Sequence, residues 1–172
     1  MSNKLTVEQV IQKEHVWLMK NPKYCLYSGI FMIGKTSVDD DVPTACTNGR
    51  DTMYGRAFME KLRESEQKGV ILHENLHKAF RHTTVWKHLY KEHAQLANMA
   101  CDYVINHKLV NTDAGKSGWI VMPKGGCYDN KYAGMSAKEV FDLLEQQSDD
   151  DDGGGSSGEG TGFDDHDWDG AK

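Results

Sequence analysis

The stretch "GVILHENLHKAFRH", residues 69–82, carries two histidines four positions apart and a glutamate directly after the first. The apolar residues on both sides predict a helix that is buried over much of its circumference. Positions four apart lie on one face of a helix, so the side chains of His73 and His77 can point at one ion. Glu74 lies about 100° further round the helix. The pattern therefore predicts a metal-binding helix with a carboxylate beside the ion.

These residue types fit the chemistry of a hydrolytic zinc site. Zinc polarises a bound water molecule and the carbonyl group of the substrate. A carboxylate that is not itself a ligand then takes a proton from the water and returns it to the leaving amine, which is the role expected of Glu74 as general base. The alternative is a solvent-exposed polar helix face without a metal, which would leave these side chains hydrated.

A catalytic zinc ion needs a third protein ligand and an open fourth position. His82 lies nine residues after His73, which is about half a rotation on a continued helix. The glycine that permits an intervening turn in the longer H-E-x-x-H-x-x-G-x-x-H pattern is absent. His82 is therefore expected to face away from the ion, and to pack beside the site rather than to bind the metal.

The preferred third ligand lies in the following segment, "LANMACDYVIN". Asn98, Asp102 and Asn106 form a polar stripe on this otherwise apolar helix. A carboxylate on the inward face of such a helix must be paired or bound to a metal, so we predict Asp102 as the third ligand. The alternative is a buried aspartate that accepts hydrogen bonds from the backbone or from His82. The two asparagines are expected to orient the carboxylate or a histidine N–H.

Local patterns predict a mixed chain of the α+β class. Helices are expected over residues 5–19, from residue 56 to about 62, through the histidine motif with Ser65 as its N-cap, over 85–110, and over 135–147 with a capping box of Ser136 and Glu139. Aromatic and β-branched residues predict one or two strands within 24–38, and Asn48-Gly49 predicts a hairpin turn. "GWIVMP", residues 118–123, is expected to be a short strand or an extended segment.

Length and charge limit the remaining classes of function. The 172 residues suit one domain, and the net charge of −6 is concentrated in residues 148–172, which hold nine acidic residues and one lysine. We expect a folded domain over residues 1–147 and a flexible, acidic, glycine-rich tail over 148–172. The nearly neutral folded part offers no basic face for nucleic acid. The chain has neither a membrane-spanning apolar run nor a signal peptide, so a soluble, cytoplasmic protein is expected.

Together these motifs resemble the putative metallopeptidase domain of bacteria and their phages, which often precedes a von Willebrand factor A-like domain. The similarity rests on "HENLHKAFRH", "ACDYVIN" and "YAGMSAKEVFDLL", followed by an acidic stretch, and it runs from about residue 24 to the end of the chain. The resemblance implies a zincin-like fold, in which a small twisted sheet packs against the H-E-x-x-H helix and a second helix delivers the third ligand. It also implies zinc-dependent peptide hydrolysis. The chain ends soon after the acidic tail, so the targeting that a von Willebrand-like domain provides is not expected.

The leading hypothesis is thus a zinc metalloendopeptidase that hydrolyses protein or peptide substrates through a metal-activated water. His73, His77 and Asp102 hold Zn²⁺, Glu74 is the general base, and the substrate binds along an edge strand. The second hypothesis is a non-catalytic, zinc-stabilised protein-binding module, encoded by a phage and acting on a host factor. Closed coordination by four ligands, with His82 as the fourth, would favour it. A metal-free helical interaction protein is the third hypothesis.

Two further predictions concern other reactive side chains. Tyr132 is either a hydrogen-bond donor to a developing oxyanion or a packing residue. The four cysteines are widely spaced and are expected to be free thiols, with Cys101 buried in an apolar helix.

Overall fold

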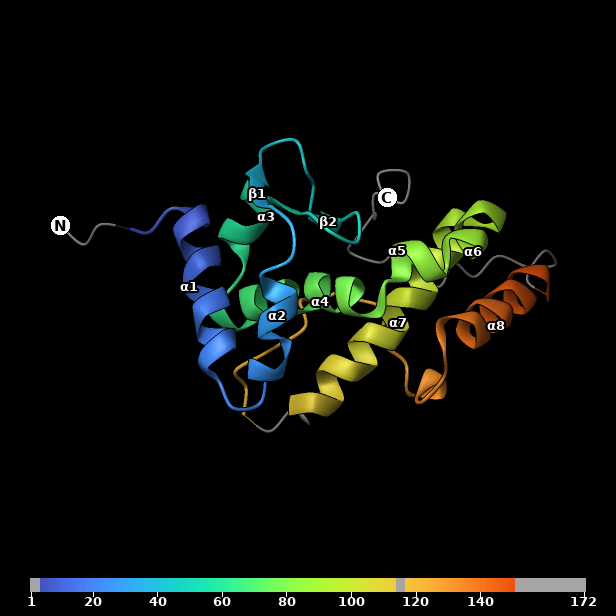
Figure 1. Ribbon diagram of the computed structural model, residues 1–172. Coiled ribbons are helices and arrows are strands. Elements are labelled where there is room, and N and C mark those ends of the chain that lie inside the picture. The colour runs from blue at the N-terminus through green and yellow to red at the C-terminus, as the bar shows by residue number, and fades with distance from the viewer. Residues whose placement is uncertain (1–3, 114–116, 151–172) are drawn as a thin grey trace.

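Helix α4, Glu64–Phe80, runs through the middle of the molecule, and the other elements surround it (Figure 1). This computed structural model describes residues 4–113 and 117–150. The further helices are α1 Val7–Lys20, α2 Ser28–Phe31, α3 Arg56–Lys61, α5 His82–Val85, α6 Lys87–Glu92, α7 Ala94–Asp113 and α8 Ala137–Asp150, with 3₁₀ turns η1 Cys25–Tyr27 and η2 Asn130–Tyr132. The strands are β1 Thr36–Asp39, β2 Ala45–Thr47 and β3 Thr52–Gly55. The predicted α+β class is confirmed.

Helix α4 is enclosed on nearly all sides. Every residue from Lys68 to Lys78 is buried, which confirms the burial predicted from the apolar neighbours of the motif. The helix begins one residue before Ser65, so the predicted N-cap was wrong. Arg63 takes the cap position, and the Glu66 carboxylate accepts a hydrogen bond of 3.0 Å from the Arg63 backbone N–H. A glutamate in the first turn also suits the positive end of the helix dipole.

The end of α4 sets the direction of the chain after the histidine motif. Arg81 adopts the left-handed conformation, with φ of 55°, and its backbone N–H donates to the carbonyl groups of His77 and Lys78. This cap stops the helix, as left-handed C-terminal residues commonly do. Helix α5 starts at the next residue and leads away in a new direction.

The sheet has three strands in the order β1-β3-β2, with β1 parallel and β2 antiparallel to β3. The hairpin predicted at Asn48-Gly49 joins β2 to β3, and Gly49 has φ of 88°, a conformation that glycine adopts without steric cost. The sheet lies over the upper side of α4 in Figure 1, and β2 is the strand that packs against that helix.

The segment from Tyr24 to Val38 contains the start of one strand, which agrees with the prediction of one or two strands, but the strand begins only near the end of the segment. Residues 25–31 form η1 and α2, and β1 begins at Thr36. Tyr24 and Phe31 are buried in the main core from this helical turn. Packing against the core therefore decides the backbone here over the β-propensity of the aromatic residues.

The single helix expected over residues 85–110 is divided into three. Trp86 separates α5 from α6, and His93 separates α6 from α7 with an extended backbone, φ −151° and ψ 98°. The His93 ring accepts a hydrogen bond of 3.3 Å from the Leu96 backbone N–H. His93 thus satisfies one of the free N–H groups at the start of α7.

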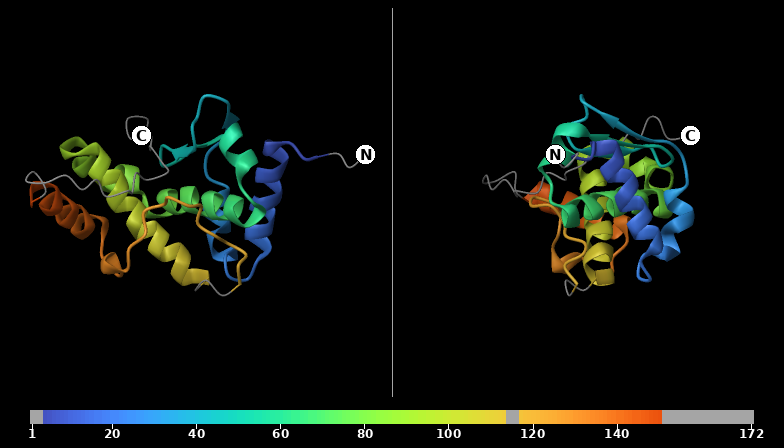
Figure 2. Two further views of the ribbon diagram at one scale, coloured as in Figure 1. Left: turned by 180° about the vertical axis from the view of Figure 1, so that it is seen from behind. Right: turned by 90° about the vertical axis from the view of Figure 1, so that its left-hand side faces the viewer.

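Two hydrophobic cores share helix α7. The main core joins α1, α4 and the sheet, and includes Ile105 and Leu109 from the second half of α7. The second core joins α6, α7 and α8, and includes Ala97 and Ala100 from the first half of α7. Figure 2 shows α7 passing obliquely from one group of helices to the other.

The capping box predicted at the start of α8 is present. The Ser136 backbone N–H donates to the Glu139 carboxylate at 2.8 Å, and the Glu139 N–H donates to the Ser136 hydroxyl at 3.3 Å. Helix α8 continues to Asp150, three residues beyond residue 147, where the folded domain was predicted to end. Residues 151–172 lie outside the described part of the chain, so the domain boundary stays a prediction. Among the described residues, no helix is long and apolar enough to cross a membrane.

The segment after α7 crosses over α4 (Figure 2, left). The sequence predicted residues 118–123 as a strand or an extended segment, and the described part is irregular rather than a strand. Its Val121 backbone N–H donates to the Ser65 carbonyl at 3.0 Å. A Cβ atom on Gly69 would lie 2.2 Å from the Val121 carbonyl oxygen. Glycine in the middle of α4 therefore allows the two backbones to approach closely.

We expect Gly69→Ala to destabilise the protein, although alanine is the better helix former by about 1 kcal/mol. The new methyl group has to displace the backbone around Val121, and such overpacking costs about 1–3 kcal/mol. The measurement is the midpoint of urea unfolding at fixed metal content. Gly29→Ala in α2 is the matched control, because a Cβ there meets nothing within 4 Å. Equal midpoints for the two variants would contradict the close approach.

Candidate metal centre

Three side chains from two helices meet where α4 packs against α7. Nε2 of His73 lies 3.0 Å from Nε2 of His77, and the Asp102 Oδ1 atom lies 3.5 Å and 3.3 Å from these two nitrogens. His73 and His77 are one helical turn apart on α4, as the spacing predicts, and Asp102 projects from α7. Within the described residues, this is the group of His, Cys, Asp and Glu side chains that is close enough to hold a metal ion.

The donor set and the spacing fit a zinc ion. Atoms bound about 2.0–2.1 Å from a tetrahedral zinc ion lie about 3.3 Å apart, and the three distances in the structure span 3.0 to 3.5 Å. All three side chains are at most 4% exposed. A carboxylate buried at this depth is costly unless a cation or a network of hydrogen bonds compensates for its charge. Two imidazoles and one carboxylate therefore form a site suited to a divalent metal.

Both histidines are oriented through their other ring nitrogen. Nδ1 of His73 lies 2.8 Å from Oδ1 of Asn106, so an Nδ1–H group would donate to the amide oxygen and leave the Nε2 lone pair for a metal. The Asn106 amide N–H in turn donates to the Cys127 carbonyl at 2.8 Å. Asn106 is fully buried, and the predicted contact of this asparagine with a ligand histidine is present.

His82 supports the second histidine. Its Nδ1 atom lies 3.3 Å from Nδ1 of His77, and its ring is 3% exposed. The prediction that His82 faces away assumed a continued helix and was wrong in that respect, because the left-handed turn at Arg81 returns the chain toward His77. It contacts the side of His77 opposite Asp102 and does not belong to the group of three. The closed four-ligand arrangement that would favour a structural site is therefore not formed by His82.

Glu74 lies beside this group on α4 and is 1% exposed. Lys78, one turn further along the helix, is also buried, and its Nζ donates to the Ile33 carbonyl at 3.2 Å. Burial lowers the pKa of Lys78 to about 8, while the negative charges of Glu74 and Asp51 oppose that change. The sequence-based reasoning missed Lys78. The signal was its spacing, because a lysine four positions after a glutamate faces it on the same side of a helix.

Two of the cysteines are buried near the candidate ligands: Cys101 lies on α7, and Cys127 lies in the segment that follows that helix. All four cysteines are free, as predicted, and Cys101 and Cys127 are buried. Burial first, and the Asp102 carboxylate second, raise the pKa of both thiols, to about 12 for Cys127. Neither cysteine belongs to the group of three side chains that lies close enough to hold an ion.

Tyr132 lies in the second core. It is 1% exposed, and its ring centroid is 4.5 Å from that of Tyr103. Lys131 Nζ lies 4.8 Å from the centre of the Tyr132 ring. These contacts favour the packing role over oxyanion stabilisation. Asn98 is nearly buried on α7, and its predicted role beside the ligands stays a prediction.

Two pockets of very different size differ in whether they adjoin a candidate ligand, His73. A groove of about 530 Å³ runs between α1, α2 and β1, and its lining includes Ile11, His15, Phe31 and Val38. None of the candidate metal ligands lines it. A much smaller pocket contains both His73 and Glu74 in its wall. Of these two pockets, the small one therefore adjoins the candidate metal centre.

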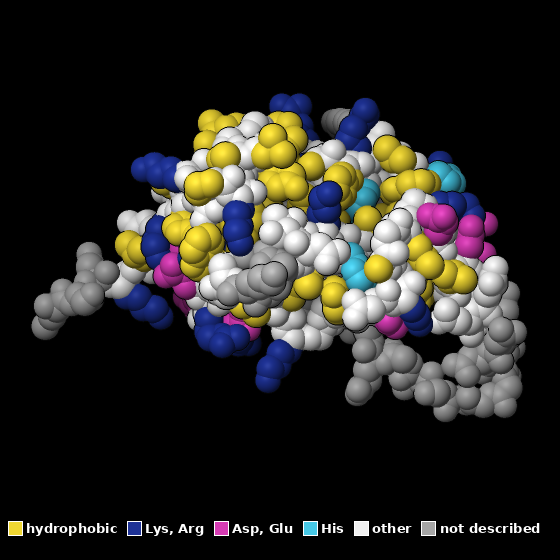
Figure 3. All heavy atoms as spheres, turned by 90° about the horizontal axis from the view of Figure 1, so that it is seen from below, with side chains coloured by type: hydrophobic (Ala, Val, Ile, Leu, Met, Phe, Trp, Pro, Cys, Tyr) yellow, Lys and Arg dark blue, Asp and Glu magenta, His cyan; other side chains and the backbone are white. Residues whose placement is uncertain are grey.

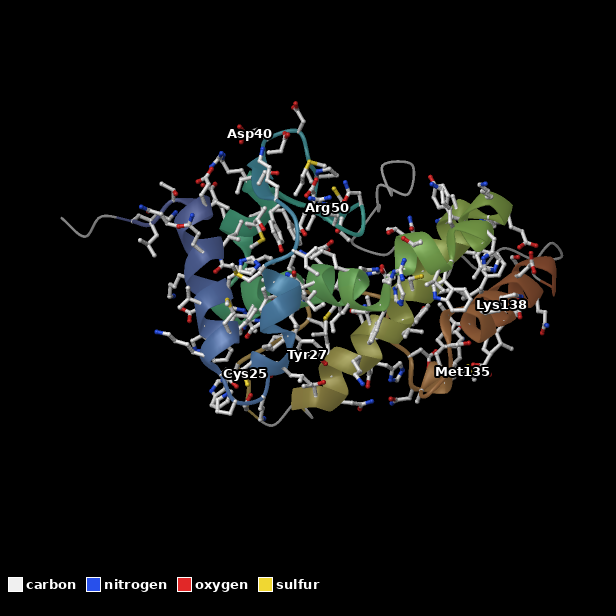
Figure 4. All side chains as sticks on the ribbon, viewed as in Figure 1. Cys25, Tyr27, Asp40, Arg50, Met135 and Lys138 are labelled. Atoms are coloured by element: carbon white, nitrogen blue, oxygen red, sulfur yellow. The ribbon has the colours of Figure 1, made fainter. Side chains whose placement is uncertain are left out.

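Charged side chains are dispersed on one face of the molecule. On the face seen in Figure 3, lysine and arginine side chains are scattered among hydrophobic ones and form no continuous basic surface. Figure 4 places Asp40 and Arg50 on loops at the sheet, and Met135 and Lys138 at the start of α8.

We expect Asn106→Leu to weaken zinc binding by about 10–100-fold, because the His73 ring loses the acceptor that fixes its orientation. Zinc affinity measured by competition with a chelating dye tests this. Asn130→Leu, an exposed asparagine outside the centre, is the control and should bind zinc as the wild type does. Unchanged affinity in Asn106→Leu would show that packing alone orients His73.

Comparison with known proteins adds one match. The model of a family described as "Putative metallopeptidase domain" matches residues 26–169. No curated protein matches the chain, and no solved structure does.

Proposed function

Because the chain belongs to the putative metallopeptidase domain family, we propose that it is a zinc-dependent endopeptidase with a zincin-like arrangement of sheet and helices. The observation that carries this proposal is the position of Glu74. A buried carboxylate lies directly after one candidate ligand, on the same helix as the second, and outside the group of three. A carboxylate that lies beside the candidate metal ligands without being one of them has the position that a general base requires.

Each side chain has a defined task in this proposal. His73, His77 and Asp102 hold the metal, which when bound supplies a Lewis acid that polarises the carbonyl and lowers the pKa of water. Glu74 accepts a proton from the attacking water while the oxygen of that water bonds to the peptide carbonyl carbon. Glu74 then gives this proton to the nitrogen as the C–N bond breaks, so the products are a carboxylic acid and an amine. Asn106 and His82 hold the two imidazoles in place.

Strand β2 is the proposed binding edge for the substrate. It pairs with β3 on one side only, and Ala45 at its start lines the same pocket as His73 and Glu74. An extended peptide can pair with the free edge of a strand through backbone hydrogen bonds that do not depend on sequence. Proteins or peptides in an extended conformation are therefore the proposed substrates.

Zinc content and peptide cleavage, measured on the same samples, test the proposal. We expect one zinc ion per chain after reconstitution, cleavage of a mixed peptide library, loss of cleavage with a chelator, and recovery on addition of zinc. Failure to bind zinc would overturn the metal centre. Binding of zinc without cleavage across the library would overturn the peptidase and favour a zinc-stabilised binding module.

A further inference from the structure

The small pocket beside the metal centre has walls from four parts of the chain. Glu74, His73 and Val70 line it from α4, and Ala45 and Thr44 line it from the start of β2. Phe58 from α3 and Met122 with Pro123 from the segment after α7 complete it. Most of the wall is apolar, and His73 and Glu74 add polar groups to it. This composition is expected of a site that receives an apolar group next to reacting atoms.

The pocket is very small. Its volume is about 10 Å³, which is room for about one water molecule. A methyl group has a similar size, whereas the side chain of leucine or phenylalanine does not fit without displacement of a wall. The two largest movable wall side chains are those of Phe58 and Met122, and both are only partly buried. These two residues therefore limit the size of the group that enters.

The segment that carries Met122 is fixed against α4. The neighbouring Val121 N–H donates to the Ser65 carbonyl at 3.0 Å, and the Val121 carbonyl packs on Gly69 so closely that a Cβ atom there would be 2.2 Å away. Pro123, directly after Met122, is buried, and its ring restricts the backbone at that position. The backbone that carries Met122 is thus held against α4, so a larger substrate side chain has to displace the Met122 side chain itself.

We propose that this pocket receives the side chain of the residue that follows the cleaved bond, and that Phe58 and Met122 restrict that residue to glycine, alanine or serine. This inference rests on the proposed function. The task of Glu74 indicates which substrate residue enters the pocket. Glu74 gives a proton to the leaving amine, so it lies next to the residue that contributes this amine. The pocket that Glu74 lines therefore takes the side chain of that residue.

Cleavage-site profiling by mass spectrometry tests the inference on the zinc-loaded protein. In wild type we expect alanine after the cleaved bond to exceed leucine by about 100-fold in kcat/KM. Phe58→Ala and Met122→Ala each enlarge the pocket and should reduce this ratio below about tenfold by raising cleavage before leucine. Met32→Ala changes an exposed methionine that does not line this pocket; it is the control and should keep the wild-type ratio.

A binding measurement separates failure of the pocket from failure of catalysis. In Glu74→Gln protein labelled with ¹³C at the methionine methyl groups, the Met122 signal is assigned by comparison with Met122→Ala. We expect it to shift on addition of Gly-Gly-Ala-Gly-Gly and not of Gly-Gly-Leu-Gly-Gly. Binding with this preference but without cleavage by wild type would overturn the peptidase and retain the pocket. Cleavage without the preference, or with the same preference in Phe58→Ala and Met122→Ala, would overturn the pocket and retain the peptidase.

Discussion

Glu74→Gln should bind one zinc ion per chain and cleave peptides about 10²–10⁴-fold more slowly than wild type, because it loses the group that transfers the proton. Glutamine has the size of glutamate and fills the same buried position, where Glu74 is 1% exposed. It cannot accept a proton at neutral pH. The effect should therefore fall on kcat, with metal content and unfolding temperature close to the wild-type values.

The measurement compares kcat, zinc content and thermal unfolding for three proteins: wild type, Glu74→Gln and Glu60→Gln. The last variant makes the same chemical change at an exposed position on α3 and should retain full activity. Wild-type cleavage by Glu74→Gln would remove the general base from the mechanism. Loss of zinc in Glu74→Gln would show that this residue is a ligand.

Asp102→Ala is expected to abolish the stabilisation of the protein by zinc. Asp102 is the ligand that comes from α7, and the two histidines of α4 alone form a much weaker site. For wild type, zinc at a thousand times its dissociation constant adds about 4 kcal/mol to the free energy of unfolding. The same zinc concentration should add almost nothing to the variant, and cleavage should be lost together with the metal.

Thermal unfolding with and without zinc checks this prediction. Asp142→Ala removes a partly exposed carboxylate from α8 and should respond to zinc as wild type does. Full stabilisation of Asp102→Ala by zinc would exclude Asp102 as a ligand. His82 would then be the first residue to test in its place, since it contacts His77.

The proximity of the candidate ligands could be predicted from two physical rules, the spacing of residues on a helix and the cost of burying a charge. Four-residue spacing places His73 and His77 on one helix face whatever the rest of the fold does. Asp102 was found from the cost of burying a carboxylate in an apolar helix, which requires a partner even when the partner is unknown. The structure places these three side chains together, and their role as ligands remains the proposal that the experiments above test.

Features that depend on tertiary packing were harder to predict. The direction of His82 depends on one left-handed residue, Arg81, and arginine carries no sequence signal for that conformation. Residue types over 24–38 predicted one or two strands without their bounds, and the one strand starts at Thr36, while the core takes Tyr24 and Phe31 from a helical turn. The pocket beside Glu74 combines four separate parts of the chain, so no local pattern indicates it.

The division of α7 between two cores gives the metal centre a further consequence. Asp102 lies between Ala100, which packs in the second core, and Ile105, which packs in the main core. Its partners His73 and His77 belong to the central helix of the main core. An ion held by all three residues would therefore cross-link α4 and α7 at the place where the main core meets the second core. The cooperativity of unfolding, and not only its midpoint, then depends on whether the metal is bound.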